Sequence, residues 1–379
     1  MKGVAIVMIK YPIRVAVIMG KYTPGGIKSV IMNYYREIDK SKIQFDFFVY
    51  DNSPDKDYSE IESMGGKIVF MSSLKNPIKN VIDCYKAFKK NNYPIVHGYL
   101  NTLNVFPMFA AWLANVPVRI AENLSTAHPG EKKSIIKSLL KPFNLIFPTH
   151  YAANAIYAGK WLYGDREFAV FRNGLDLSKY KHDEARRKAI RAQYGIIDNF
   201  VIGHIGRYEY QKNHSFLIDV FKAIHDRDNK ARLLLVGYGS LKDEIWNKIS
   251  NLGLQNAVVD AGKTEDIIPL YDAMDCFVLP SFYEGLPVVG IEAQAMGLPC
   301  IFSDEVTSEV KIIHEVLFLS LSNDVNIWAD TILSMQNSKR AKENTEDFIT
   351  SGYNIKEESL RLSRYYLSCL NDLRSEYTL

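Results

Sequence analysis

Short apolar runs alternate with longer amphipathic segments along most of the chain, and this alternation strongly constrains the fold. Apolar runs bounded by polar or glycine-containing segments are typical of strands that are buried on both faces of a parallel sheet. The amphipathic segments between them are typical of the helices that connect such strands. Strands are expected at 14–18, 45–49, 67–70, 95–97, 117–121 and 145–147, and then at 200–205, 232–236, 257–260, 276–279 and 299–302.

Two such series in one chain predict an α/β protein with two doubly wound, parallel-sheet (Rossmann-like) domains that face a cleft. The length of 379 residues leaves room for both domains. The boundary is expected at the turn-prone tetrad Asn173-Gly174-Leu175-Asp176, which gives domains of 1–173 and 174–355. Helices are expected between the strands, for example at 26–38, 103–114, 213–225, 240–250, 265–273 and 287–296.

The segment PSFYEGLPVVGIE carries two glutamates, Glu284 and Glu292, around a strand-to-helix turn. Gly285 and Leu286 lie where the helix opens, so free backbone N–H groups there would form an anion site. A carboxylate at each side of that site can bind hydroxyl groups. A sugar nucleotide has this layout, with a sugar, a diphosphate and a ribose.

A second phosphate signal lies upstream, where an apolar strand ends at Gly206 and is followed by Arg207 and Lys212. Two cations after one strand end could neutralise a leaving diphosphate, which is the main electrostatic task in breaking a sugar–phosphate bond. Either motif alone could also be a solvated loop. The two motifs together, in this order, indicate a sugar-nucleotide site far more specifically than either motif alone.

With these motifs and several other segments, the chain resembles the retaining glycosyltransferases of family 4 (glycosyl transferases group 1) of the bacterial surface or capsular polysaccharide type. The resemblance implies the two-domain GT-B architecture and a C-terminal helix, about 356–379, that crosses back onto the first domain. It also implies that a sugar is moved from a nucleotide diphosphate sugar with retention of configuration. The sequence does not identify the nucleotide, for which UDP is the first expectation and GDP the second. The other segments that carry it are 13–18 with the glycine loop, 151–164, 170–176 and 233–237.

The resemblance also implies residue roles on the donor side. Arg207 and Lys212 would stabilise the leaving phosphates, Glu284 would contact the transferred sugar, and Glu292 would hold the ribose hydroxyls. Structural interpretations stay open beside these roles, such as a tight turn, a surface charge or a helix-surface glutamate. Contacts to the nucleotide sugar are expected from Gly25, Gly26, Gly206, Lys263, Gly285, Leu286 and Glu292.

The acceptor side departs from the family's pattern. Related enzymes often carry a histidine pair in a sequence like Arg-Ile-Ala-His-x-His, whereas this chain reads RIAENLSTAH, with Glu122 and Leu124 in the histidine positions. His97, which closes an expected strand and would face the cleft, and Glu122 are the preferred catalytic candidates, with His128 as an alternative. A histidine at a strand end can equally be a buried structural group.

The charge is divided unevenly, because residues 1–175 carry a net +10 and the remainder a net −7. Residues 131–143 read EKKSIIKSLLKPF, which places apolar residues on one helical face with lysines around them. Such a helix can lie on an anionic membrane surface, or it can pack on its own domain. The expected acceptor is therefore a glycan or a polyprenol-linked glycan. The expected location is the cytoplasm, either free or in peripheral contact with the inner face of the plasma membrane.

Other classes receive little support. The four cysteines match no metal or disulfide framework, and the two Asp-x-Asp pairs lie in turn-like segments, so neither a metal nor a cofactor is expected. No nucleic-acid-binding module is present, so nucleic acid is not an expected partner. The segment GYGSLK lacks the third glycine of a dinucleotide fingerprint, which disfavours a nicotinamide-dependent oxidoreductase. A non-catalytic partner subunit with the same fold remains an alternative because of the missing histidine pair.

Overall fold

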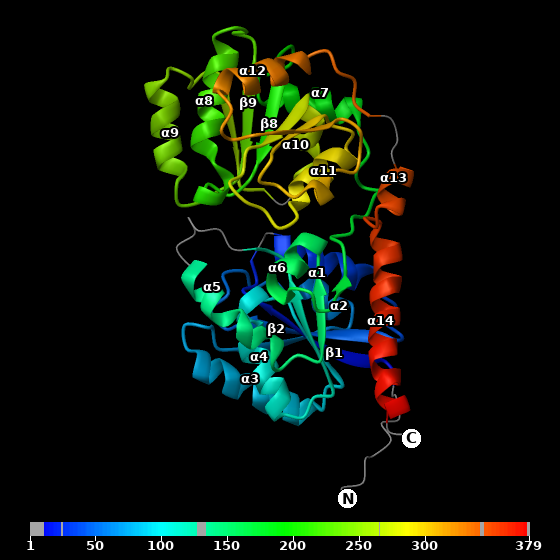
Figure 1. Cartoon of the computed structure of the whole chain (residues 1–379). Helices are drawn as coiled ribbons and strands as arrows, with labels where there is room; N and C mark the ends of the chain where they lie inside the picture. The colour runs from blue at the N-terminus through cyan, green and yellow to red at the C-terminus, as the bar shows by residue number, and fades with distance from the viewer. Residues whose placement is uncertain (1–10, 24–25, 127–133, 265, 342–344, 377–379) are drawn as a thin grey trace, which may run out of the picture. The chain divides into compact units, whose positions relative to one another are not determined.

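The structure is a computed structural model, and it divides the chain into two compact units. Unit 1 comprises residues 1–175 together with 352–379, and unit 2 comprises residues 176–351. Each unit contains one parallel sheet with helices between its strands, so the predicted fold class is confirmed for both (Figure 1). The described residues are 11–23, 26–126, 134–264, 266–341 and 345–376.

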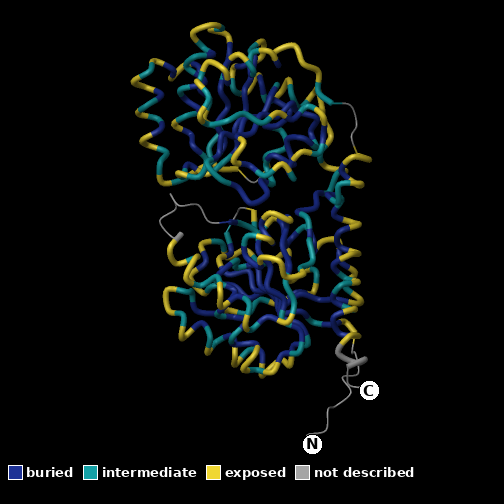
Figure 2. The backbone as a smooth tube through the Cα atoms, in the orientation of Figure 1, coloured by how far each residue is buried: buried dark blue, intermediate teal, exposed yellow. Residues whose placement is uncertain are grey.

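The sheet of unit 1 has seven strands in the order β3-β2-β1-β4-β5-β6-β7. Central strand β1 is buried along nearly its whole length, as the continuous apolar run predicts (Figure 2). Its Val17 is in register with Phe47 on one side and His97 on the other. The strands are β1 Ile13–Gly20, β2 Ile43–Tyr50, β3 Lys67–Met71, β4 Ile95–Gly98, β5 Val118–Asn123, β6 His150–Ala153 and β7 Ala169–Val170.

Helices cover both faces of this sheet. Alternate residues of the strands, such as Ala16 and Ile18, pack with α3 and α4 on one face. On the other face Tyr35 of α1 and Tyr366 of α14 both contact Phe45 of β2. The helices are α1 Gly26–Glu37, α2 Ser59–Ser63, α3 Pro77–Asn91, α4 Val105–Leu113, α5 Ser134–Leu140, α6 Ile156–Tyr163 and α14 Ile355–Glu376.

The chain returns to unit 1 through its last helix. A bridge pairs Leu175 with Asn354, and α14 then packs along α1. The buried carboxylate of Glu358, at the start of α14, accepts a hydrogen bond from the backbone N–H of Arg172 at 2.9 Å. The segment at 172–175, where the chain leaves unit 1, is thus joined to the segment at 354–358, where the chain re-enters it.

The sheet of unit 2 has six strands in the order β10-β9-β8-β11-β12-β13. The chain runs outward from β8 to β10 and then returns to place β11 on the other side of β8, so the order reverses between β8 and β11. In open parallel sheets this reversal leaves a crevice at the carboxyl ends of the two strands. The strands are β8 Val201–Ile205, β9 Arg232–Val236, β10 Val258–Gly262, β11 Cys276–Leu279, β12 Cys300–Ser303 and β13 Val316–Leu319.

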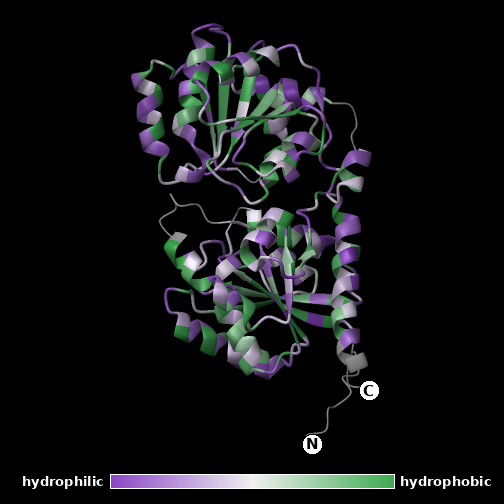
Figure 3. Cartoon of the chain, viewed as in Figure 1, coloured by the Kyte–Doolittle hydropathy of each residue, from purple (hydrophilic) through white to green (hydrophobic). Residues whose placement is uncertain are grey.

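Helices α8, α9 and α12 bury one face of this sheet, where Phe221, Ile245 and Trp328 join strand residues in a large apolar cluster. Helices α10 and α11 cover the other face, since Tyr271 contacts Phe277 and Gly290 lies against Phe302. The strands of this sheet are mostly hydrophobic, whereas the helices around them mix hydrophobic and hydrophilic residues (Figure 3). The helices are α7 Glu184–Gln193, α8 His214–His225, α9 Lys242–Asn251, α10 Ile268–Ala273, α11 Val288–Ala295, α12 Val325–Ser334 and α13 Thr345–Thr350.

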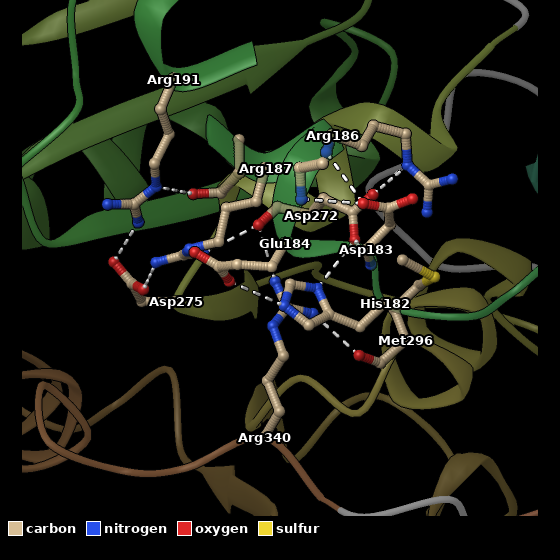
Figure 4. A network of polar contacts seen from close by, with 12 residues as sticks. His182, Asp183, Glu184, Arg186, Arg187, Arg191, Asp272, Asp275, Met296 and Arg340 are labelled. Carbon is tan, nitrogen blue, oxygen red and sulfur yellow. Dashed lines mark hydrogen bonds and ion pairs between the residues drawn. The ribbon is translucent and has the colours of Figure 1, made fainter. Parts of the chain in front are cut away.

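A polar network fixes the start of unit 2 onto α10 (Figure 4). Arg187 and Arg191 of α7 donate hydrogen bonds to Asp275 at 2.5 and 2.7 Å. Arg340 donates to the backbone carbonyls of Tyr271, Asp272, Met274 and Met296 at 2.7 to 2.9 Å. Those carbonyls lie at and just beyond the C-terminal ends of α10 and α11, where helices lack intrahelical donors, so this guanidinium caps both helices.

One expected strand is wrong. Residues 145–147 do not form a strand, because the chain there leaves a 3₁₀ turn, η2 Pro142–Leu145, and the next strand is β6. Phe147 instead packs its ring 5.0 Å from that of Phe109 in α4. The apolar run between Pro142 and Pro148 therefore packs against α4 and is not part of the sheet. None of the helices in the described part of the chain is long and apolar enough to cross a membrane.

Candidate functional site

The residues expected to contact the donor gather at one edge of the sheet of unit 2. Arg207 and Lys212 follow β8, Lys263 follows β10, and Glu284 follows β11, while Glu292 lies in the helix after β11. All strands of this sheet are parallel, so their carboxyl ends share an edge. The site lies where the strand order reverses, between β8 and β11.

The loops after β8 and β9 cross at a distance that requires glycine. A Cβ added to Gly237, whose φ is +155°, would lie 2.0 Å from the carbonyl oxygen of Gly206. At Gly206 an added Cβ would lie 2.9 Å from Nε2 of His204 and 3.1 Å from Cγ of Lys212. A side chain at Gly206 would therefore push against the lysine. Gly206, expected to contact the nucleotide sugar, thus leaves the space that the Lys212 side chain occupies.

His204 lies beneath this loop as a neutral group. Its Nδ1 donates a hydrogen bond to the carbonyl oxygen of Val278 at 2.8 Å, and burial lowers the pKa of the imidazole to about 4. Lys212 is therefore the cation at this position. The neutral His204 links β8 to β11 through its hydrogen bond.

Lys212 and Glu284 form an ion pair across the point of strand reversal. Nζ of Lys212 lies 2.6 Å from Oε1 of Glu284, and the side chains are only 13% and 8% exposed. Ser281 donates to the same carboxylate oxygen at 2.9 Å, and Gln211 donates to the other at 3.1 Å. A cation and an anion thus lie side by side, held by the loops after β8 and β11.

A stacked aromatic pair also joins these two loops. The rings of Tyr210 and Phe282 lie 4.6 Å apart, and the backbone N–H of Phe282 donates to the carbonyl of Gln211 at 2.9 Å. Because these residues are close in sequence to Lys212 and Glu284, both contacts hold the two loops together next to the ion pair.

Helix α11 begins at Val288, with Pro287 as its N-cap, so Gly285 and Leu286 precede the helix as buried residues of the turn. The expected helix, 287–296, starts one residue before the observed one, and its free N–H groups were expected at Gly285 and Leu286. The first N–H groups of a helix have no intrahelical partner, and those of α11, from Val288 onward, follow Glu284 after three intervening residues. This arrangement suits an anion at the strand-to-helix turn.

Glu292 lies on α11 with only 7% of its surface exposed. Its Oε2 accepts a hydrogen bond from the hydroxyl of Tyr271 at 3.0 Å, and its Oε1 accepts one from Tyr180 at 2.9 Å. Burial raises the pKa of this carboxyl to about 7, while the two tyrosine hydroxyls lower it. The alternative interpretation of Glu292 as a helix-surface glutamate is therefore wrong, because the carboxylate is buried and hydrogen-bonded.

The remaining donor candidates are exposed. Arg207 lies at the end of β8, and Lys263 follows Gly262 with its ammonium 5.2 Å from the ring centre of Tyr238. Such side chains can move onto a ligand at little cost because they are not fixed by burial. Of the glycine loop in unit 1, Gly26 begins α1 with open space around its Cα, and Gly25 lies outside the described residues.

His97 and Glu122 lie together in the interior of unit 1. Nε2 of His97 is 2.9 Å from Oε2 of Glu122, and Nδ1 is 2.8 Å from the hydroxyl of Tyr366 in α14. The side chains are 0% and 2% exposed. His97 was expected to face the cleft, but its side chain is fully buried and contacts Tyr366 of α14. The catalytic role of His97 and Glu122 stays a prediction, and His128 lies outside the described residues.

Sequence reasoning missed Tyr180, Tyr271, Gln211 and Ser281, which hold the two glutamates. Gln211 and Ser281 are adjacent or close to predicted residues, so proximity in the sequence was an available signal. Tyr180 lies 112 residues from Glu292, and nothing in the pattern links them. Among the described residues, no group of three or more His, Cys, Asp or Glu side chains is arranged to hold a metal ion.

The chain is similar to known proteins both in a family match within unit 2 and in the fold of the whole chain. The model of the family described as glycosyl transferases group 1 matches residues 199–338, which lie in unit 2. Among solved structures, Anabaena Alr3699/HepE in complex with UDP and glucose superposes with a TM-score of 0.78 at 18% identity, covering 94% of this chain and 100% of that one. This likeness concerns the fold.

Two curated relatives extend over most of the chain. A UDP-Gal:alpha-D-GlcNAc-diphosphoundecaprenol alpha-1,3-galactosyltransferase of Escherichia coli is 28% identical, over 78% of this chain and 80% of its own length. The putative glycosyltransferase EpsF of Bacillus subtilis (strain 168) is 34% identical over 368 residues, 93% of this chain and 96% of its own length. With the matched family model and the two-sheet fold, this similarity shows that the chain belongs to the glycosyltransferases of the glycosyl transferases group 1 family.

Proposed function

We propose that the protein transfers a sugar from a UDP-sugar to a glycan or lipid-linked acceptor during cell-surface polysaccharide synthesis. The reaction retains the configuration of the sugar and needs no metal ion. The Lys212–Glu284 pair carries this proposal, because it places a cation and a hydroxyl-binding carboxylate together at the strand reversal of unit 2. The relative from Escherichia coli, whose name gives a UDP-galactose donor and a diphosphoundecaprenol-linked acceptor, supports the substrate classes.

Each part of the donor has a matching group in unit 2. The diphosphate would lie at the start of α11, with Lys212 and the exposed Arg207 against its charge. Glu284 would accept hydroxyl groups of the transferred sugar, and Glu292 would accept those of the ribose. Lys263 would reach the base from the end of β10.

Bond breaking leaves negative charge on the departing phosphate, and a fixed cation lowers the energy of that state. Lys212 is suited to this role because Glu284, Ser281 and Gly206 define its position before the donor arrives. A preorganised charge needs little rearrangement during the reaction. The two cations could therefore take the place that a divalent ion holds in other transferases.

The first prediction concerns the charge of Lys212. Lys212→Ala should reduce kcat by roughly a hundredfold or more, since loss of one transition-state charge contact has an effect of this size. Lys212→Arg should retain part of the activity. Lys222→Ala, on the exposed face of α8, is the matched control and should behave as wild type. Thermal unfolding must accompany the kinetics, because the substitution leaves Glu284 without its cation. A folded Lys212→Ala protein with wild-type kcat would contradict the assignment.

The second prediction concerns the stereochemistry of the product. Retention is proposed on the family resemblance alone. Proton NMR of the product immediately after transfer should show the anomeric coupling of the donor. An inverted coupling in the first product formed would refute retention.

The membrane contact is proposed through α5. Ile135 and Leu139 are 74% and 66% exposed, so the apolar face of this helix is not packed on unit 1. Phe143, in the turn that follows, is also exposed, and Lys137 and Lys141 lie between these residues. An apolar face flanked by lysines in the basic half of the chain suits an anionic membrane surface. Residues 131–133 of the expected helix lie outside the described residues.

The third prediction tests this surface. Wild-type protein should sediment with anionic vesicles at low salt, bind neutral vesicles less, and be released at high salt, because screening weakens charge attraction. Ile135→Asp with Leu139→Asp should reduce binding without loss of stability, since both side chains are exposed. Ile197→Asp, at a residue 57% exposed in unit 2, is the control. Equal binding of wild type and the double variant would exclude α5 as the contact. Equal binding to anionic and neutral vesicles, or binding to neither, would favour a soluble acceptor.

A further inference from the structure

The carboxylate of Glu292 is held by two tyrosines from different parts of unit 2. Tyr271, on α10, is fully buried, and its hydroxyl lies 3.0 Å from Oε2 and also 3.0 Å from the carbonyl oxygen of Val289. Tyr180, in the segment that begins unit 2, is half-buried, and its hydroxyl lies 2.9 Å from Oε1. The two tyrosines therefore contact opposite oxygens of one carboxylate.

The hydrogen-bonding capacity of Glu292 is then half used. An ionised carboxylate has about four acceptor sites, two on each oxygen. Among the described residues, one site on each oxygen accepts from a tyrosine, which leaves one site on each oxygen for a ligand. Two acceptor sites on one carboxylate match the two hydroxyls of a vicinal diol, which is the group that a ribose presents.

The position of Tyr180 is set by the residue next to Tyr271. Asp272 is fully buried, and its Oδ1 lies 2.8 Å from Nδ1 of His182 and accepts the backbone N–H of Asp183 at 3.0 Å (Figure 4). Arg186 also contacts this carboxylate. Because Asp272 fixes residues 182 and 183 onto α10, the segment that carries Tyr180 is anchored close to Glu292. Helix α10 thus organises both tyrosines.

We propose that Tyr180 is a positioning residue of the nucleotide site, which acts with Tyr271 to hold the Glu292 carboxylate so that each oxygen offers one acceptor to a ligand diol. This inference rests on the proposed function, because it concerns the same site. It adds a residue from the start of unit 2, outside the motifs around Glu284 and Glu292. Removal of the Tyr180 hydroxyl should therefore weaken diol binding without removing the diol-binding group itself.

The same contact makes diol binding depend on pH in a definite direction. Burial raises the pKa of Glu292 to about 7, and the hydroxyls of Tyr180 and Tyr271 oppose that rise. The ionised form accepts from a diol at both oxygens, so diol binding should strengthen as pH rises through about 7. Without the Tyr180 hydroxyl, the ionised form is less stable, and the midpoint should move to higher pH.

The test is calorimetric titration of the full chain with UDP and with 2′,3′-dideoxyuridine diphosphate, which lacks both ribose hydroxyls. The ratio of the two affinities isolates the diol, because both ligands carry the same titrating phosphates. Tyr180→Phe should lower this ratio about three- to tenfold near pH 7, as expected for one hydrogen bond. It should also move the midpoint of the pH dependence upward, and Tyr271→Phe should shift it in the same direction. Tyr194→Phe, at the end of α7, is the matched control and should leave both unchanged.

The outcomes separate this inference from the function on which it rests. Wild-type protein that binds UDP, with a Tyr180→Phe variant that keeps the wild-type ratio and midpoint, overturns the positioning role alone. A purely structural role for Tyr180 would lower the melting temperature without changing the ratio, which also overturns it. Failure of the wild-type protein to bind UDP at any pH overturns both the proposed donor and this inference.

Discussion

The parallel alignment of the strands in unit 2 is the constraint on which the candidate site depends. Parallel strands end at one edge of a sheet, so residues far apart in the sequence meet there. The reversal of order between β8 and β11 then opens a position between the two loops. Lys212 and Glu284, which are 72 residues apart, meet at that position with their charged atoms 2.6 Å apart. Gly206 and Gly237 allow a different close approach, that of the loops after β8 and β9, and a side chain at Gly206 would push against Lys212.

The two glutamates of the site are stabilised in different ways, and this difference follows from their neighbours. Glu284 has a cation within contact distance, together with donors from Ser281 and Gln211. Glu292 instead has two neutral tyrosine hydroxyls, and burial raises its pKa to about 7. The first carboxylate is thus paired with charge at the place where phosphate charge would develop. The second sits among neutral donors, which suits the binding of neutral hydroxyl groups.

Much of the fold could be predicted because buried parallel strands are continuous apolar runs. Strands β8, β9 and β11 were expected within one residue of their bounds. The prediction of a strand at 145–147 was wrong. The apolar residue Phe147 packs against Phe109 outside the sheet. At the site, the motifs indicated Lys212 and Glu284 separately, but their direct pairing depends on the tertiary structure. The burial of His97 under α14 and the contact of Tyr180 with Glu292 could not be predicted, since both join segments more than a hundred residues apart.

The central claim is that the carboxyl edge of the unit 2 sheet binds the nucleotide of the donor. Hydrogen–deuterium exchange of the full chain with and without UDP tests this most directly, because a bound ligand slows exchange of the amides that it contacts and stabilises. The account predicts slower exchange in residues 206–213 and 285–292, with no comparable change at β4 and β5 of unit 1. Slower exchange confined to unit 1, or saturating UDP with no change at either segment of unit 2, would contradict it.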